Sequence, residues 1–155
     1  MVSSMRQLPP QELKNLLLND GLVSAADIDS AFTDARQLGQ DPVTILVSRG
    51  VLTLDYFYTL LAGSLGVARA NLGGRTIDES ILRLIPEAMA RERRAIVFDR
   101  SKRGELLVAM DDPTDLQSID FLSKYLSIRV VPYLATDDDL NKGYRLYGKQ
   151  STVDF

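Results

Sequence analysis

The sequence predicts an α+β protein: a four-helix subdomain built on a duplicated helix–glycine–helix motif, followed by a small α/β subdomain with about three strands and flanking helices. Two observations support this prediction. In the first half of the chain, a set of apolar residues and one glycine recurs after 29 residues without a gap. After residue 94, the apolar residues form short runs typical of strands instead of the spacing typical of helices. We therefore expect a helical first half and a mixed second half.

The repeat covers residues 17–32 and, at the constant offset, residues 46–61. Each copy is expected to hold the end of one helix, a turn at Gly21 or Gly50, and the start of the next helix. Glycine suits the residue just past a helix because it adopts a positive φ without a Cβ clash. The unit of helix, glycine turn and helix is thus predicted twice.

Four helices are expected in residues 11–67, after a flexible arm at residues 1–10. Ser24 and Thr53 stand where N-caps should restart the chain after each glycine. Apolar residues at helical spacing define the helices, and the short loops between them predict a bundle. The predicted helices cover residues 11–20, 25–37, 42–48 and 54–65.

The second half is predicted to be a subdomain at residues 75–148. Turn-forming residues at 68–74 precede it, and a linker or tail at 149–155 follows it. Two apolar runs that flank residues 100–104 predict a β-hairpin. Pro132 cannot donate a ladder hydrogen bond, so its strand is expected at a sheet edge. The predicted elements are a helix over 79–85 that Pro86 reopens through residue 93, strands over 95–98, 106–110 and 128–134, and helices over 115–122 and 140–147.

Charge and composition exclude several classes of function. The net charge of −3 and the pI near 5.0 disfavour a sequence-independent grip on nucleic acid or on an anionic membrane, which needs clustered Lys and Arg. The chain has no cysteine and no histidine, which removes thiol catalysis, the usual zinc sites and the commonest general base. No apolar run approaches the roughly 20 residues that cross a bilayer. We expect no nucleic-acid partner, no membrane insertion, no metal, no cofactor, no catalytic residue and a cytosolic location.

Two local patterns suggest a ligand site, and neither is favoured. The acidic residues within 111–120 could offer carboxylates to a magnesium ion. The run at 112–115 is also typical of a turn that caps a helix, which is the interpretation we favour. Residues 73–76 have the glycines of a phosphate loop but lack its lysine, so ATP binding by that route is not expected.

Two groups of residues are candidates for binding a protein partner. Arg91, Arg93 and Arg94 form the only dense basic cluster of the sequence and could dock an acidic partner. A solvated helix end explains these arginines about as well. An unpaired strand edge offers main-chain groups to a partner. The second candidate surface is therefore the predicted edge strand, with Arg129, Val131 and Tyr133.

Several motifs follow the repeat in a fixed order. They are Leu82-x-x-Ile85-Pro86-x-x-x-Ala90-x-x-x-Arg94-Ala95-Ile96, then Leu107-x-Ala109-Met110-x-Asp112-Pro113-x-Asp115, and finally Val130-x-Pro132-x-Leu134-Ala135. Together with the repeat, this ordered set closely resembles the N-terminal domain of type II secretion and type IV pilus assembly ATPases. The resemblance covers residues 11–148.

The resemblance implies a non-catalytic docking and regulatory domain. In that family, a flexible linker joins the domain to a hexameric motor ATPase, and the domain docks on cytoplasmic parts of the inner-membrane assembly platform. The implied partners are a platform protein and, if the chain is part of a longer protein, the motor ATPase domain. The implied location is cytoplasmic, peripheral to the inner membrane through these partners.

One branch of the family implies an alternative function, sensing of cyclic di-GMP. Its doubled consensus begins with Arg-Leu-Gly, passes through the central glycine and ends in glutamine. Here Glu12 and Asp41 occupy the arginine positions, and Ala35 and Ser64 occupy the glutamine positions. Negative charge beside a dianionic ligand is unfavourable, so the docking function is favoured. The residues of the alternative site would be Leu13, Leu17, Gly21, Leu22, Leu46 and Gly50, with Arg36, Gln37 and Gln40 as replacements for the lost polar groups.

Overall fold

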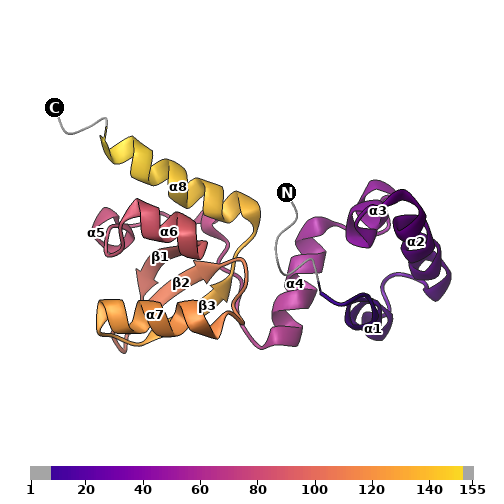
Figure 1. The fold of residues 1–155 in the computed structure, drawn as a ribbon, viewed down its shortest axis with the longest axis horizontal. Coiled ribbons are helices and arrows are strands. Elements are labelled where there is room, and N and C mark those ends of the chain that lie inside the picture. The colour runs from indigo at the N-terminus through magenta and orange to yellow at the C-terminus, as the bar shows by residue number, and fades with distance from the viewer. Residues whose placement is uncertain (1–7, 152–155) are drawn as a thin grey trace. The chain divides into compact units, whose positions relative to one another are not determined.

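The computed structural model describes residues 8–151 and separates them into two compact units, with the division between Gly66 and Val67. The first unit is made of helices, and in the second unit helices surround a small sheet (Figure 1). The α+β class and the order of a helical half before a mixed half are confirmed. In the described part of the chain, no helix has the length and apolar character needed to span a bilayer.

The first unit contains α1 (Pro10–Asp20), α2 (Ala25–Leu38), α3 (Pro42–Ser48) and α4 (Leu54–Leu65). The predicted bounds of all four helices are confirmed to within one residue. Ser24 and Thr53 are N-caps, because their side-chain oxygens accept hydrogen bonds from the backbone N–H groups three residues later. Pro10 opens α1, and the predicted arm lies outside the described residues up to residue 7.

The sequence repeat is also a structural repeat. Gly21 and Gly50 follow α1 and α3 with φ values of +81° and +76°, which residues with a Cβ rarely adopt. α1 packs on α4, and α3, which is one repeat later than α1, packs on α2. The apolar positions of the two copies are buried in matched pairs: Leu17 and Leu46, Val23 and Leu52, Ile28 and Phe57, and Phe32 and Leu61. One repeated apolar pattern therefore builds this core.

The second unit is organised around a three-stranded sheet in the order β1-β2-β3. β1 (Ala95–Arg100) and β2 (Leu106–Met110) form the predicted hairpin, and β3 (Val130–Leu134) pairs with β2 in parallel. β3 lies at an edge, as its proline predicts. α7 (Leu116–Leu126) connects β2 to β3 and covers one side of the sheet, whereas α6 (Glu87–Arg93) and α8 (Asp137–Ser151) lie on the other side (Figure 1).

Two predicted boundaries are corrected. The helix expected over 79–85 and onward to 93 is two short helices, α5 (Glu79–Leu82) and α6. Pro86 has no N–H and disfavours a helical conformation in the residue before it, so the helix cannot run through. At the other end, α8 continues through residues 149–151, where a linker was predicted. A single exposed glycine costs a helix only about 1 kcal/mol, so Gly148 does not end it. Residues 152–155 lie outside the described part of the chain.

The segment at 68–74, expected between the subdomains, belongs to the second unit. Leu134 N–H donates to the Ala68 carbonyl (2.9 Å), and Ala70 N–H donates to the Leu134 carbonyl (2.8 Å). The turn η2 (Leu72–Gly74) is then held by α8, where the Asp139 carboxylate accepts from Leu72 N–H at 2.9 Å. Ala70 and Leu72 are fully buried. This segment therefore covers the outer edge of β3 at its C-terminal end.

Candidate functional site

The apolar positions of the alternative nucleotide site lie mostly in the core of the first unit. Leu13, Leu17 and Leu46 expose 2%, 2% and 0% of their surface, so these side chains hold the helices together and are closed to a ligand. Gly21 and Gly50 form the two turns. Leu22, by contrast, is 56% exposed, beside the first of these turns. Folding alone accounts for most of this set.

The polar positions of the family's nucleotide motif have other roles here. The Asp41 carboxylate caps α3 by accepting from Val43 N–H at 3.3 Å. The Ser64 hydroxyl donates to the Leu61 carbonyl at 3.0 Å, and Ala35 is buried, at 6% exposure. Glu12 is exposed in the first turn of α1, where negative charge favours the helix. None of these four side chains can stack on a guanine or pair with a phosphate as an arginine does.

The three proposed replacement residues lie together but on the surface. Arg36 and Gln37 are exposed in the last turn of α2, and Gln40 is exposed in the loop that follows. The structure thus groups Arg36, Gln37 and Gln40 at one end of α2, away from the buried leucines of the motif. They could meet a ligand only at the outside of the unit.

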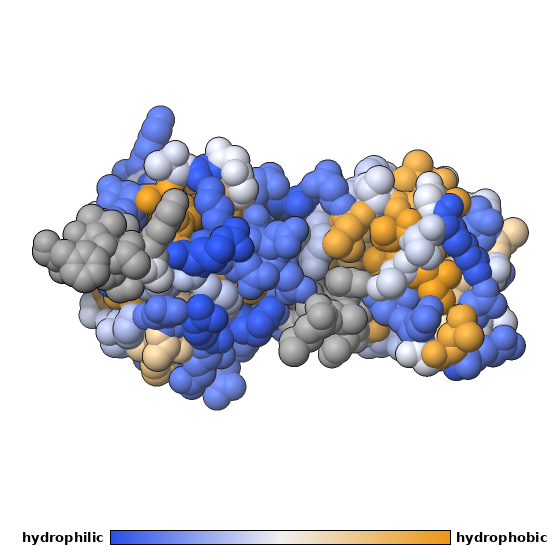
Figure 2. Space-filling model, turned by 90° about the horizontal axis from the view of Figure 1, so that it is seen from above, coloured by the Kyte–Doolittle hydropathy of each residue, from blue (hydrophilic) through white to orange (hydrophobic). Residues whose placement is uncertain are grey.

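The first unit carries the net charge of the protein and much of its exposed apolar surface. Residues 1–66 contain four Lys and Arg against seven Asp and Glu, a net −3, while residues 67–155 contain 14 of each. Figure 2 shows hydrophobic residues gathered on one face of this unit, at the right of the view. The large exposed apolar side chains described in it are Leu18, Leu22, Leu38, Leu54 and Tyr56. An acidic surface with apolar patches fits a protein partner better than an anionic nucleotide.

In the second unit, Arg91 and Arg93 on α6 are engaged with neighbouring side chains. Arg91 Nε donates to the Glu87 carboxylate at 2.9 Å, and its guanidinium lies 4.5 Å from the centre of the Tyr144 ring. Arg91 also lines a groove of about 820 Å³ between α6 and α8. The Arg93 guanidinium lies 4.0 Å from the centre of the Phe121 ring. Both arginines remain at the surface, where they can meet a partner.

Arg94 has a structural role instead. It ends α6 in the left-handed region, with φ of +50°. Its guanidinium pairs with the carboxylates of Asp111 at 2.5 Å and of Asp137 at 3.2 Å. Asp111 is only 4% exposed; burial raises the pKa of its carboxyl above the ordinary value, and the Arg94 guanidinium opposes that rise. Arg94 thus ties α6 to the end of β2 and the start of α8.

The edge strand β3 offers fewer free groups than the sequence suggested. Pro132 has no N–H, and both main-chain groups of Leu134 are bonded to residues 68–70. Val131 and Tyr133 are half-buried, and the Tyr133 ring meets the Phe98 ring edge-on at 5.2 Å. β3 and β1 are opposite edges of the sheet, and α6 packs on β1. The two predicted partner-binding groups are therefore not brought onto one surface.

Arg129 is the most exposed member of the β3 group. Its side chain is 79% exposed, and its Nε lies 3.3 Å from the Glu105 carboxylate. The sequence identified this arginine as a candidate, and the structure places it just before the strand.

An exposed aromatic pair on α7 was not identified from the sequence. Phe121 and Tyr125 are 37% and 51% exposed, and their rings stack at 6.3 Å with an interplanar angle of 13°. The signal was present in the spacing of four residues, which places them on one helix face. Their stripe differs from the buried one that contains Leu122. With Arg93 over Phe121, the pair forms an aromatic and cationic surface typical of protein interfaces.

The acidic run after β2 caps a helix, as predicted. The Asp112 carboxylate accepts from Thr114 N–H at 3.0 Å, and the Asp115 carboxylate accepts from Ser118 N–H at 3.2 Å. Within the described residues, no group of three acidic, histidine or cysteine side chains is placed to hold a metal ion.

Comparison with known proteins gives a consistent picture. The MshEN domain family matches residues 65–153. The type IV pilus assembly ATPase PilB of Thermus thermophilus is 25% identical over 134 residues, which cover 86% of this chain and 15% of PilB. The chain therefore spans about 15% of the length of that relative.

Two solved structures share the fold. The structure of MshE with cdg, the abbreviation of cyclic di-GMP, is 30% identical; the match has a TM-score of 0.68 and covers 87% of this chain and 97% of that one. The N-terminal domain of XpsE is 13% identical, with a TM-score of 0.54 over 86% of this chain and 91% of that one. The XpsE likeness is one of fold alone.

Proposed function

Because this chain belongs to the MshEN domain family, we propose that it is a non-catalytic docking and regulatory domain. It couples the motor of a type II secretion or type IV pilus assembly system to the inner-membrane assembly platform through protein contacts. The fold is that of the N-terminal domain of secretion and pilus ATPases. The proposed location is cytoplasmic, peripheral to the inner membrane through the platform protein. Where the chain is part of a longer protein, the motor ATPase is its second partner.

One observation carries the choice of docking over nucleotide sensing. The positions that hold arginine and glutamine in the nucleotide-binding branch hold Glu12, Asp41, Ala35 and Ser64 here. In the structure, Asp41 and Ser64 are used by the fold itself, and Ala35 is buried. What is kept from the motif is the apolar and glycine frame that the bundle needs in any case.

The second candidate function is a cyclic di-GMP sensor that regulates the attached motor. The likeness to MshE, which was solved with cdg, favours it. Under this alternative, Arg36, Gln37 and Gln40 would replace the missing polar groups from the end of α2. The acidic character of the unit opposes it, since a dianion would approach a surface of net −3.

The docking proposal is tested with the cytoplasmic part of the platform protein from the same secretion or pilus system. We expect micromolar or tighter binding by calorimetry and at least a tenfold weakening on Arg91→Glu, because Arg91 is exposed and its removal leaves no buried partner. Asp138→Lys, an exposed charge reversal on α8, is the control and should bind as the parent does. The absence of binding to the platform protein would contradict the proposal.

A further inference from the structure

An open groove lies between α1 and α4 in the first unit. It measures about 440 Å³, and its lining is largely apolar, with Leu16 and Leu60 contributing side chains. At one side the Tyr56 hydroxyl donates to both carboxylate oxygens of Asp20 at 2.9 Å. The nucleotide motif does not include these four residues.

The repeat makes the groove comparable with an equivalent place between α2 and α3. The offset of 29 residues takes Asp20 to Arg49, and it takes Ser30 and Asp34 to Thr59 and Gly63. Between α2 and α3, Arg49 crosses from one helix to the other: its guanidinium donates to Ser30 Oγ at 3.1 Å and pairs with the Asp34 carboxylate. A salt bridge thus spans the two helices in this half.

The same bridge cannot form in the other half. Gly63 has no side chain to meet a partner, and a Cβ built on it would contact nothing within 4 Å. Asp20 is shorter than an arginine and carries the opposite charge. The residues that close the surface between α2 and α3 are therefore replaced, at the equivalent positions, by residues that leave it open between α1 and α4.

The charge of the groove selects its occupant. Asp20 is its one ionisable lining residue at neutral pH among those described, and no basic residue lines it. The unit around it has a net charge of −3. An anionic ligand is disfavoured there, whereas a Lys or Arg of a partner could pair with the Asp20 carboxylate while a leucine packs between Leu16 and Leu60. Cytoplasmic segments next to membrane spans are rich in Lys and Arg.

We propose that the groove between α1 and α4 docks a basic amphipathic helix of a partner protein. This inference rests on the proposed docking function and names the chemistry of the segment that the domain recognises. Apolar side chains at i and i+4 of that helix fill the groove, and a basic side chain reaches Asp20.

The first test is an NMR titration of the whole chain with two synthetic helical peptides. The peptides have the same length and the same leucine positions, and one carries lysine where the other carries glutamate. We expect amide shifts confined to α1 and α4 with the lysine peptide, and at least tenfold weaker binding of the glutamate peptide. Equal affinity for both peptides, no binding of the lysine peptide, or shifts centred outside α1 and α4 would overturn the proposal.

The second test copies the closed half onto the open one. The double variant Asp20→Arg with Gly63→Asp supplies the bridge that Arg49 and Asp34 make, and it should weaken the lysine peptide at least tenfold. Asp27→Asn is the matched control, because residue 27 is the repeat equivalent of Tyr56 in the closed half; its affinity should equal that of the parent. Asp20→Asn, which keeps a partner for the Tyr56 hydroxyl, should lose at least threefold even if the double variant folds poorly. Parent-like affinity of Asp20→Asn would overturn the proposal.

The platform protein separates the two proposals. If the parent binds it and the Asp20 variants bind equally well, the groove is not the docking site, although the docking function stands. If the parent does not bind it, the proposed function itself is wrong.

Discussion

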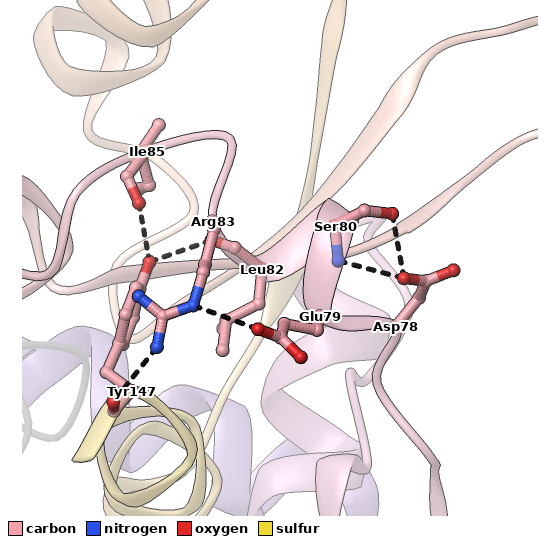
Figure 3. A network of polar contacts seen from close by, with 7 residues as sticks. All are labelled: Asp78, Glu79, Ser80, Leu82, Arg83, Ile85 and Tyr147. Atoms are coloured by element: carbon pink, nitrogen blue, oxygen red, sulfur yellow. Dashed lines mark hydrogen bonds and ion pairs between the residues drawn. The ribbon is translucent and has the colours of Figure 1, made fainter. Parts of the chain in front are cut away.

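The Tyr147 hydroxyl on α8 has a defined structural role. It donates to the carbonyls of Leu82 at 2.8 Å and of Ile85 at 2.9 Å, and Arg83 donates back to the Tyr147 carbonyl (Figure 3). These bonds serve the break between α5 and α6, where carbonyls lose their helical partners. Burial raises the pKa of Tyr147 to about 12, so the hydroxyl stays protonated and able to donate at neutral pH.

Tyr147→Phe should therefore destabilise the second unit. The buried carbonyls of Leu82 and Ile85 lose their shared donor, and the expected loss in free energy of unfolding is about 1–3 kcal/mol. The matched control is Tyr144→Phe, because the Tyr144 hydroxyl is buried with no hydrogen-bond partner among the described residues. Chemical denaturation should show Tyr144→Phe within about 0.5 kcal/mol of the parent. Equal losses in the two variants would contradict these hydrogen-bond assignments.

A second residue-scale prediction concerns pH. Arg94→Gln leaves the buried Asp111 carboxylate without its guanidinium, which should cost about 1–3 kcal/mol at pH 7. The folded-state pKa of Asp111, already raised by burial, then rises further above its unfolded value. The cost is therefore complete above that pKa and shrinks as the pH falls through it, since a protonated carboxyl needs no cation.

The measurement is the difference in thermal stability between Arg94→Gln and the parent at pH 7 and near pH 4. The difference should be smaller at the lower pH. Adding Asp111→Asn to Arg94→Gln should remove most of the pH dependence of the difference. A deficit of the same size at both pH values would mean that Arg94 acts through packing and not through Asp111.

At the scale of elements, two helical glycines have opposite surroundings. A Cβ added to Gly143 on α8 would meet Ile96 side-chain atoms of β1 at 2.5 Å, so α8 approaches the sheet closely at this point. A Cβ added to Gly63 on α4 would meet nothing within 4 Å. Only the first glycine is required by packing.

Alanine substitutions at Gly143 and Gly63 should accordingly change stability in opposite directions. Gly143→Ala overpacks the contact with Ile96 and should cost about 1–3 kcal/mol. Gly63→Ala should gain about 0.5–1 kcal/mol from helix propensity. Urea denaturation measures both, and Ile96→Val should reduce the cost of Gly143→Ala by removing the nearest methyl group. A neutral Gly143→Ala would show that α8 stands further from β1.

The sequence predicted elements best where the determinants are local. In the first unit, each helix begins at a cap or a proline and ends at or just before a glycine, and all of these are visible in the sequence. The segment at 68–74 has only turn-forming residues, and its structure depends on Leu134 and Asp139, more than 60 residues away. Local signals cannot supply such contacts.

The same reason explains what was missed in the candidate sites. The arginines of α6 form one cluster in the sequence, but Arg94 turns to Asp111 and Asp137, which only the folded sheet brings near. The groove between α1 and α4 depends on comparing Asp20 and Gly63 with Arg49 and Asp34 across helix pairs. The repeat was visible in the sequence, but the pairing of its helices was not.

At the scale of the whole molecule, the two units divide the protein's properties. The first unit is acidic and keeps the apolar and glycine frame of the nucleotide motif, whereas the second is neutral overall and presents arginines and an aromatic pair. Both units offer surfaces to proteins. Neither offers a cluster of cations facing a cavity fitted to a cyclic dinucleotide, among the residues described.

The central claim is that this chain keeps the fold of its family without the nucleotide site. Its most direct test is a calorimetric titration of the chain with cyclic di-GMP, with the N-terminal domain of MshE as the positive control. The account predicts no heat of binding and no thermal shift for this chain while the control binds. Micromolar or tighter binding by this chain would contradict the account, and loss of that binding on Arg36→Ala and Gln40→Ala would locate the site at the end of α2.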